Sequence, residues 1–170
     1  MKIFLNIVFF RYLFYLWWQE YACFYLTKNI SLCILLPLVI INHKELETLI
    51  NFAKSSLPKE CCAFLIGTNS RDEVIIYNIV TLRNYDESIF SFSIDPQDLF
   101  FGYKQADQLG LEVVGVFHSH PSLPFPSSKD KKFMRLNPFI WLIYSTVTEE
   151  YKGFIYRQQI KEVKLHIIMG

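Results

Sequence analysis

The order of hydrophobic and polar residues predicts a domain in which strands and helices are mixed. Short apolar runs, and runs in which apolar and polar residues alternate, predict strands that end at turn residues or prolines. The stretch 89–94 alternates phenylalanine with serine, as a half-buried strand does. The predicted strands cover residues 36–41, 61–67, 73–82, 89–94, 112–120, 139–145, 151–157 and 163–169.

Three capping residues predict three helices between these strands. Asn42, Asp95 and Ser127 have side chains that suit the N-cap position. Apolar residues repeat at helical spacing after Asn42, and Pro96 follows Asp95 at the first turn of the second helix. Pro58 ends the first predicted helix, and Gly110 closes the second. Because no repeat or linker interrupts the chain after residue 35, we expect one α/β (or α+β) domain built on a mixed sheet.

Residues 1–35 form a leader with a different composition from the rest. The whole chain is 52% hydrophobic and 19% charged, yet residues 1–41 hold only four charged side chains, Lys2, Arg11, Glu20 and Lys28. The remaining residues are about 22% charged, which is ordinary for a globular domain. We therefore predict a domain over residues 36–170 behind an aromatic-rich, hydrophobic leader.

Three interpretations of the leader stay open. As a membrane anchor, residues 3–18 are shorter than the roughly 20 residues that a spanning helix needs, and Arg11 in their middle costs about 2.5–3.5 kcal/mol. As a signal peptide, they have a positive start and a short apolar run but no small-residue cleavage site. As a mis-assigned start, they would precede a domain that begins near Leu38.

Charge and cysteine content narrow the class of protein further. The hydrophobic content excludes an intrinsically disordered chain. A net charge of +1 provides no electrostatic reason to expect nucleic acid as a partner. The four cysteines form no CxxC pair, and the adjacent Cys61 and Cys62 are poorly placed to bridge. The lack of a disulfide pattern among the cysteines favours a reducing, cytoplasmic location.

The segment GVFHSHPSLPFPSSKD, residues 115–130, carries the most informative motif. His118 and His120 are two residues apart on a predicted strand, so they face one side while Ser119 faces the other. Asp130 follows in the first turn of a helix, after a proline-rich loop that can bring it back to the strand end. Two imidazoles and a carboxylate are typical of catalytic zinc, with a fourth position left for water.

Each half of this motif also has an ordinary explanation. A pair of histidines on a strand is more often half-exposed without a metal, and residues 127–130 alone make an N-terminal capping box. The two halves lie at one strand-to-helix junction, where four polar groups serve no packing purpose. Their adjacency therefore favours a metal site.

The motif resembles that of the JAMM, or MPN-plus (JAB-type), zinc isopeptidases, especially archaeal and bacterial members. That family has a glutamate early in the domain, then His-x-His, then Ser-x-x-Asp, and residues 57–67, LPKECCAFLIG, match its early part. The resemblance extends from about residue 38 to the end of the chain. It implies a mixed β-sheet flanked by helices, with cytidine-deaminase-like layering.

The resemblance implies a role for each matching residue. His118, His120 and Asp130 would bind one Zn²⁺ ion. Glu60 would deprotonate the attacking water and pass the proton to the leaving amine, as a general base within hydrogen-bond reach does. Ser127 would stabilise the oxyanion of the tetrahedral intermediate.

The chain departs from the family pattern at two places. The loop Pro121–Pro126 has six residues where the family usually has seven, so either Ser127 or Ser128 takes the role of the serine. The spacing to Asp130 favours Ser127. Ala63 stands where a glycine is common. Neither change removes a metal ligand.

Two other functions are alternatives to a metalloenzyme. Cys61 or Cys62 could act as a nucleophile beside a histidine, but both lie in an apolar strand, where cysteine usually behaves as a small hydrophobic residue. A non-catalytic MPN-type interaction scaffold would not need the complete set of Glu60 and the three ligands. His43 and His166 are expected to be structural or solvated.

The resemblance also implies a substrate class. Family members hydrolyse isopeptide or peptide bonds after the C-terminal Gly-Gly of ubiquitin-like or sulfur-carrier modifiers. We therefore expect a deubiquitinase-like metalloprotease whose partners are such a modifier and its conjugates. An exposed strand edge near the zinc would bind the extended tail of the modifier by β-addition. Membrane association would depend on the leader alone.

Overall fold

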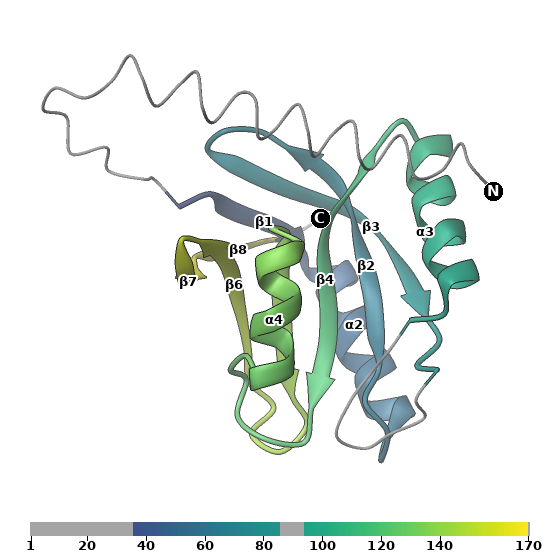
Figure 1. Ribbon diagram of the computed structural model, residues 1–170, viewed down its shortest axis with the longest axis vertical. Coiled ribbons are helices and arrows are strands. Elements are labelled where there is room, and N and C mark those ends of the chain that lie inside the picture. The colour runs from purple at the N-terminus through teal and green to yellow at the C-terminus, as the bar shows by residue number, and fades with distance from the viewer. Residues whose placement is uncertain (1–35, 86–93, 170) are drawn as a thin grey trace, which may run out of the picture. The chain divides into compact units, whose positions relative to one another are not determined.

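The computed structural model describes residues 36–85 and 94–169 (Figure 1). Over these residues the chain forms eight strands and three helices. The strands are β1 (Leu38–Asn42), β2 (Cys62–Asn69), β3 (Glu73–Leu82), β4 (Glu112–His120), β5 (Ile140–Ser145), β6 (Tyr151–Arg157), β7 (Gln159–Val163) and β8 (Leu165–Ile168). The helices are α2 (His43–Ser56), α3 (Pro96–Gln108) and α4 (Ser128–Leu136).

All eight described strands belong to one mixed sheet, with the order β7-β6-β5-β4-β2-β3-β1-β8. β2 pairs antiparallel with β3, as the predicted hairpin requires, and also antiparallel with β4. β4 pairs parallel with β5, and β1 pairs parallel with both β3 and β8. The expected mixed α/β class is therefore confirmed, and β4 lies inside the sheet with a partner on each side.

Helices cover both faces of this sheet (Figure 1). α2 packs its buried Leu46 and Leu49 on one face, in the same core cluster as Phe117 of β4. α3 packs Ala106 on the other face, and α4 packs Met134 there against β5 and β6. Burying a leucine or methionine side chain contributes about 1.5–3 kcal/mol, so these contacts hold each helix on its face.

The predicted helix caps are confirmed. Asn42 accepts a hydrogen bond from the backbone N–H of Lys44, and Asp95 accepts one from Gln97. At the end of α3, Gly110 has a φ of 66°, and its N–H donates to the carbonyl of Asp107. This left-handed position after the helix is one that glycine adopts without steric cost.

The C-terminal part differs from the prediction. One strand was expected over 163–169, but the structure has two, β7 and β8, on either side of Lys164. β7 pairs antiparallel with β6 through a tight turn at Gln158, whose φ is 58°. The turn has no glycine, and β7 is a mostly exposed edge strand, so neither turn chemistry nor an apolar pattern indicated it.

The strand predicted over 89–94 and the free strand edge expected near the metal have different outcomes. The strand predicted over 89–94 lies mostly outside the described residues, although Ile94 forms a bridge with Asn84. The edges of the described sheet are β7 and β8, so β4 itself offers no free edge for β-addition beside its histidines.

The leader, residues 1–35, is also outside the described residues, and the proposed boundary near residue 36 stays a prediction. None of the three described helices is long and apolar enough to span a membrane.

Candidate metal centre

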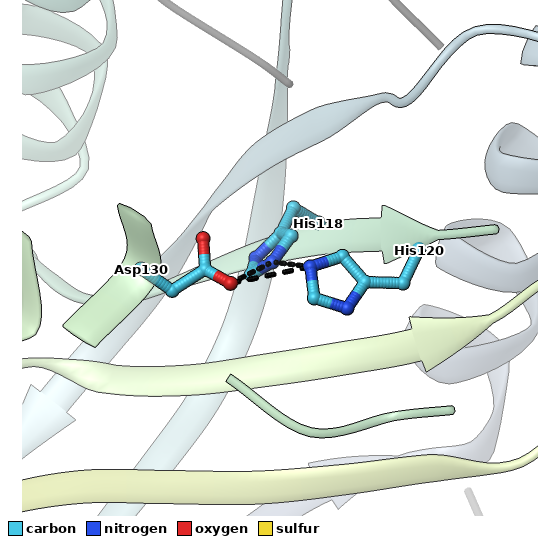
Figure 2. A group of neighbouring side chains, drawn as sticks. All are labelled: His118, His120 and Asp130. Carbon is cyan, nitrogen blue, oxygen red and sulfur yellow. Dashed lines mark hydrogen bonds and ion pairs between the residues drawn. The ribbon is translucent and has the colours of Figure 1, made fainter. Parts of the chain in front are cut away.

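Three potential ligands converge where β4 ends and α4 begins (Figure 2). The Nε2 atoms of His118 and His120 are 3.0 Å apart. The Oδ2 atom of Asp130 lies 3.5 Å from Nε2 of His118 and 3.2 Å from Nε2 of His120. Ligands on a tetrahedral zinc with bonds of about 2.0–2.2 Å lie roughly 3.3–3.6 Å apart. The three observed distances, 3.0, 3.2 and 3.5 Å, are close to this range, so the donor types and their positions suit a metal ion of this kind.

The local sequence explains why these side chains meet. His118 and His120 share one face of β4 because strand residues alternate. Ser127 is the N-cap of α4, and its backbone N–H donates to Oδ2 of Asp130 at 2.7 Å. The N–H of Asp130 donates in return to Oγ of Ser127 at 3.2 Å. This capping box turns the carboxylate of Asp130 back toward the strand end.

The proline-rich loop between them is held against β6. The ring of Phe125 lies 6.0 Å from that of Phe154, and Nζ of Lys152 lies 4.8 Å above the Phe125 ring. Lys152 also pairs with Glu162 of β7 at 3.1 Å. The one-residue-shorter loop therefore still delivers Ser127 and Asp130 to the strand end, with Ser127 at the cap position that the Ser-x-x-Asp spacing favoured.

Burial and charge set the protonation of the three groups. His118 is fully buried, and His120 and Asp130 are 5% and 3% exposed. Burial alone would raise the pKa of Asp130, but hydrogen bonds to the two histidines and to Ser127 hold this pKa well below its usual range. Burial lowers the pKa of His118. Burial alone would also lower the pKa of His120, but its hydrogen bond to Asp130 and the negative charge there raise it. An ionised carboxylate beside a neutral imidazole is a ready ligand set.

Glu60 is buried next to this group. It is 6% exposed, and it interacts electrostatically with His120, Asp130 and Lys129. Burial raises the pKa of Glu60 to about 7, although the positive charges of His120 and Lys129 oppose this shift. A carboxylate with a pKa near neutrality accepts and returns a proton efficiently near pH 7.

The structure weakens the alternative of a cysteine nucleophile. Cys61 and Cys62 are both buried, and burial raises the pKa of the Cys61 thiol. Burial also raises the pKa of Cys62, to about 12, and its thiol donates to the carbonyl oxygen of Leu82 at 3.9 Å. Reactive cysteines need a lowered pKa. The other described histidines are exposed, with His43 beside Glu47 and His166 on β8, as expected.

Two neighbours of the site were not identified from the sequence. Trp141 of β5 packs edge-on against the ring of His118, with centroids 5.7 Å apart. Asn84, which follows β3, donates from Nδ2 to the carbonyl oxygen of Glu60 at 3.0 Å. Both contacts join residues far apart in sequence, and no local pattern indicates them.

Comparisons with known proteins agree with this geometry. A family model described as prokaryotic homologues of the JAB domain matches residues 43–158. The chain belongs to this family. The resemblance to JAMM-type proteins is thereby confirmed, and so is the expected class of enzyme, a JAMM-type hydrolase.

Two kinds of relative support the assignment. The chain is similar to a curated Pyrococcus furiosus protein named desampylase, with 36% identity over 75% of this chain and 89% of the relative. It is also similar to the solution structure of a Desulfitobacterium hafniense protein, with 28% identity, a TM-score of 0.69, and coverage of 78% of this chain and 94% of the other. A Salinibacter ruber protein, 22% identical with a TM-score of 0.59 over 76% of this chain and 90% of that one, shares the fold.

Proposed function

We propose that this chain is a zinc-dependent isopeptidase that hydrolyses the bond after the C-terminal Gly-Gly of a ubiquitin-like or sulfur-carrier modifier. The observation that carries the proposal is the convergence of His118, His120 and Asp130 beside the buried carboxylate of Glu60. The curated relative's name, desampylase, indicates removal of a ubiquitin-like modifier. The free cysteines and the ordinary charge of the domain suit a cytoplasmic enzyme.

In this proposal His118, His120 and Asp130 hold the zinc. When bound, zinc supplies Lewis acidity, which polarises a carbonyl group and lowers the pKa of water to about 7. Glu60 takes a proton from the attacking water at a carboxylate oxygen and delivers it to the leaving amine nitrogen. Its pKa of about 7 suits both transfers at neutral pH.

Ser127 has a structural role and, in this proposal, a catalytic role. Its Oγ accepts a hydrogen bond from the N–H of Asp130 in the capping box, and a serine hydroxyl can donate a hydrogen bond as well as accept one. In the proposal this O–H donates to the oxygen of the substrate carbonyl as negative charge develops there. One such donor is worth about 2.7–4 kcal/mol in a site that excludes water.

An apolar pocket next to the ligands suits the modifier tail. The pocket has a volume of about 290 Å³, and its walls include Phe64, Val116, Phe133 and Trp141. Trp141 connects the pocket to the site because it also packs against His118. An apolar side chain of the tail would bury its surface there while the small Gly-Gly end reaches the ligands.

The test is cleavage of a modifier with a C-terminal Gly-Gly, fused or isopeptide-linked to a second protein, by purified full-length protein with one zinc per chain. The proposal expects cleavage after the second glycine, and loss of at least about 100-fold in kcat for Glu60→Gln. Equal rates for the wild type and Glu60→Gln would contradict it. Purification without stoichiometric zinc and without cleavage would instead support a non-catalytic scaffold.

A further inference from the structure

Glu60 lies in a stretch of backbone between regular elements. α2 ends at Ser56 and β2 begins at Cys62, so the strand ladder does not hold Glu60 directly. Its side chain is nonetheless buried, and the charges of His120 and Asp130 act on it. A functional side chain keeps one orientation only when neighbouring groups fix the backbone that carries it. The contacts of the peptide group that joins Glu60 to Cys61 identify those groups.

The first contact comes from Ser119, between the two histidines. The backbone N–H of Cys61 donates to Oγ of Ser119 at 3.0 Å, and the N–H of Ser119 donates to the carbonyl oxygen of Cys61 at 3.1 Å. These reciprocal bonds extend the β2–β4 pairing one residue beyond the strand, with a hydroxyl as one acceptor. Ser119 is 1% exposed, so water cannot replace this hydroxyl.

The second contact comes from Asn84, at the carbonyl oxygen of the same peptide group. Its Nδ2 donates to the carbonyl oxygen of Glu60 at 3.0 Å. Asn84 is itself held by its bridge to Ile94, ahead of α3. The carbonyl oxygen and the N–H of the Glu60–Cys61 peptide group are thus both bound by side chains, which come from two other segments of the chain.

We propose that Ser119 and Asn84 are positioning residues that hold the Glu60 carboxylate at the metal centre. This inference rests on the proposed function, in which Glu60 transfers the proton. Ser119 projects from β4 to the face opposite His118 and His120, since strand residues alternate, so it acts through Cys61 and Glu60. The serine between the two histidines therefore links the strand that carries these two ligands to the backbone that carries Glu60.

The protein offers a matched control for Ser119. Ser145 is also fully buried, lies opposite His120 at the end of the neighbouring strand β5, and accepts backbone N–H bonds from Val147 and Thr148 at 3.3 and 3.0 Å. Its hydroxyl stabilises a turn. Replacement of either serine by alanine leaves buried N–H groups without an acceptor, so both variants should lose stability.

The experiment compares zinc-loaded full-length Ser119→Ala, Ser119→Thr and Ser145→Ala in cleavage of a Gly-Gly-linked modifier fusion. For Ser119→Ala we expect kcat to fall on the order of 10- to 100-fold, because a displacement of about 1 Å at a reacting group has that effect. KM should change less than about threefold, zinc should stay at one per chain, and threonine should restore kcat. Ser145→Ala should lower Tm with kcat within about twofold of wild type.

Several results would overturn the inference. A kcat for Ser119→Ala that matches Ser145→Ala would show that its hydroxyl only stabilises the fold. Loss of zinc from Ser119→Ala would show that it positions the histidines instead. If Ser119→Ala does not fold, Asn84→Ala decides under the same criteria.

A measurement without substrate separates this inference from the proposed function. Hydrogen exchange at the Cys61 N–H should be slow in the wild type and in Ser119→Thr, and at least about tenfold faster in Ser119→Ala. The amides of β5 should keep their protection in all three proteins. Unchanged exchange at Cys61 would overturn the inference, even if the wild type cleaves no modifier.

Discussion

Glu60 should destabilise the zinc-free protein at the pH at which it supports activity. Burial raises its pKa from 4.5 to about 7, so the folded state disfavours the ionised carboxylate. A group with a raised folded pKa contributes its full stability below pH 4.5, and this contribution is lost as pH rises through 7. Glutamine in its place carries no charge, so Glu60→Gln should avoid the loss.

The pKa shift sets the size of the effect. A difference of about 2.5 pKa units at about 1.4 kcal/mol per unit corresponds to at most ~3.5 kcal/mol, most of which is present at pH 8. At pH 4.5 or below, Glu60→Gln and the wild type should differ by little. The gain in stability should accompany the loss of activity, because the same burial tunes Glu60 for proton transfer.

Urea unfolding of chelator-treated proteins at pH 4.5, 6 and 8 measures this difference. The free energy of unfolding of Glu60→Gln should exceed that of the wild type by an amount that grows with pH. Glu112→Gln removes an exposed carboxylate at the start of β4 and serves as the control, with no comparable gain. If Glu60→Gln is equal to or less stable than the wild type at pH 8, Glu60 is not the buried, destabilising carboxylate described above.

Three further predictions follow from named contacts. Removal of zinc with a chelator should lower Tm, because a ligand at a thousand times its Kd stabilises the folded protein by about 4 kcal/mol. In Asp130→Asn the chelator should leave Tm unchanged. Equal Tm values for the wild type with and without zinc would contradict a metal site. Ser127→Ala removes the cap that orients Asp130, so it should lower the free energy of unfolding in urea by about 0.5–2 kcal/mol. It should also weaken zinc binding about tenfold in chelator competition. An unchanged stability and zinc affinity would refute the role of Ser127 in orienting Asp130. Gly110→Ala should cost about 1–2 kcal/mol because of the positive φ, whereas an unchanged denaturation midpoint would show that the backbone relaxes.

The region from β4 to α4 could be predicted from the sequence because local rules determine it. Strand alternation places His118 and His120 on one side, Pro121 ends the strand, and the cap at Ser127 determines where α4 begins. Their convergence with Asp130 then follows from a short connection. The strand order and the parallel pairing of β1 between β3 and β8 depend on contacts between distant segments, which periodicity does not encode.

In the surroundings of the site, too, the features that the sequence did not predict depend on contacts between distant segments. The pKa of Glu60 depends on burial by the folded domain. The backbone of Glu60 contacts Asn84, 24 residues away, and that of Cys61 contacts Ser119, 58 residues away. β7 was missed because Lys161 and Glu162 make it polar and its turn at Gln158 has no glycine. Propensity is a weak guide where cross-strand pairing alone selects a strand.

Zinc titration into the metal-free protein, followed by cleavage of a Gly-Gly-linked modifier fusion, tests the central claim most directly. Activity should rise in proportion to zinc and stop at one equivalent per chain. His120→Ala should gain no activity over that range, and Glu60→Gln should bind zinc but stay inactive. Cleavage at full rate without zinc, or a Glu60→Gln protein as active as the wild type at one equivalent, would contradict the account.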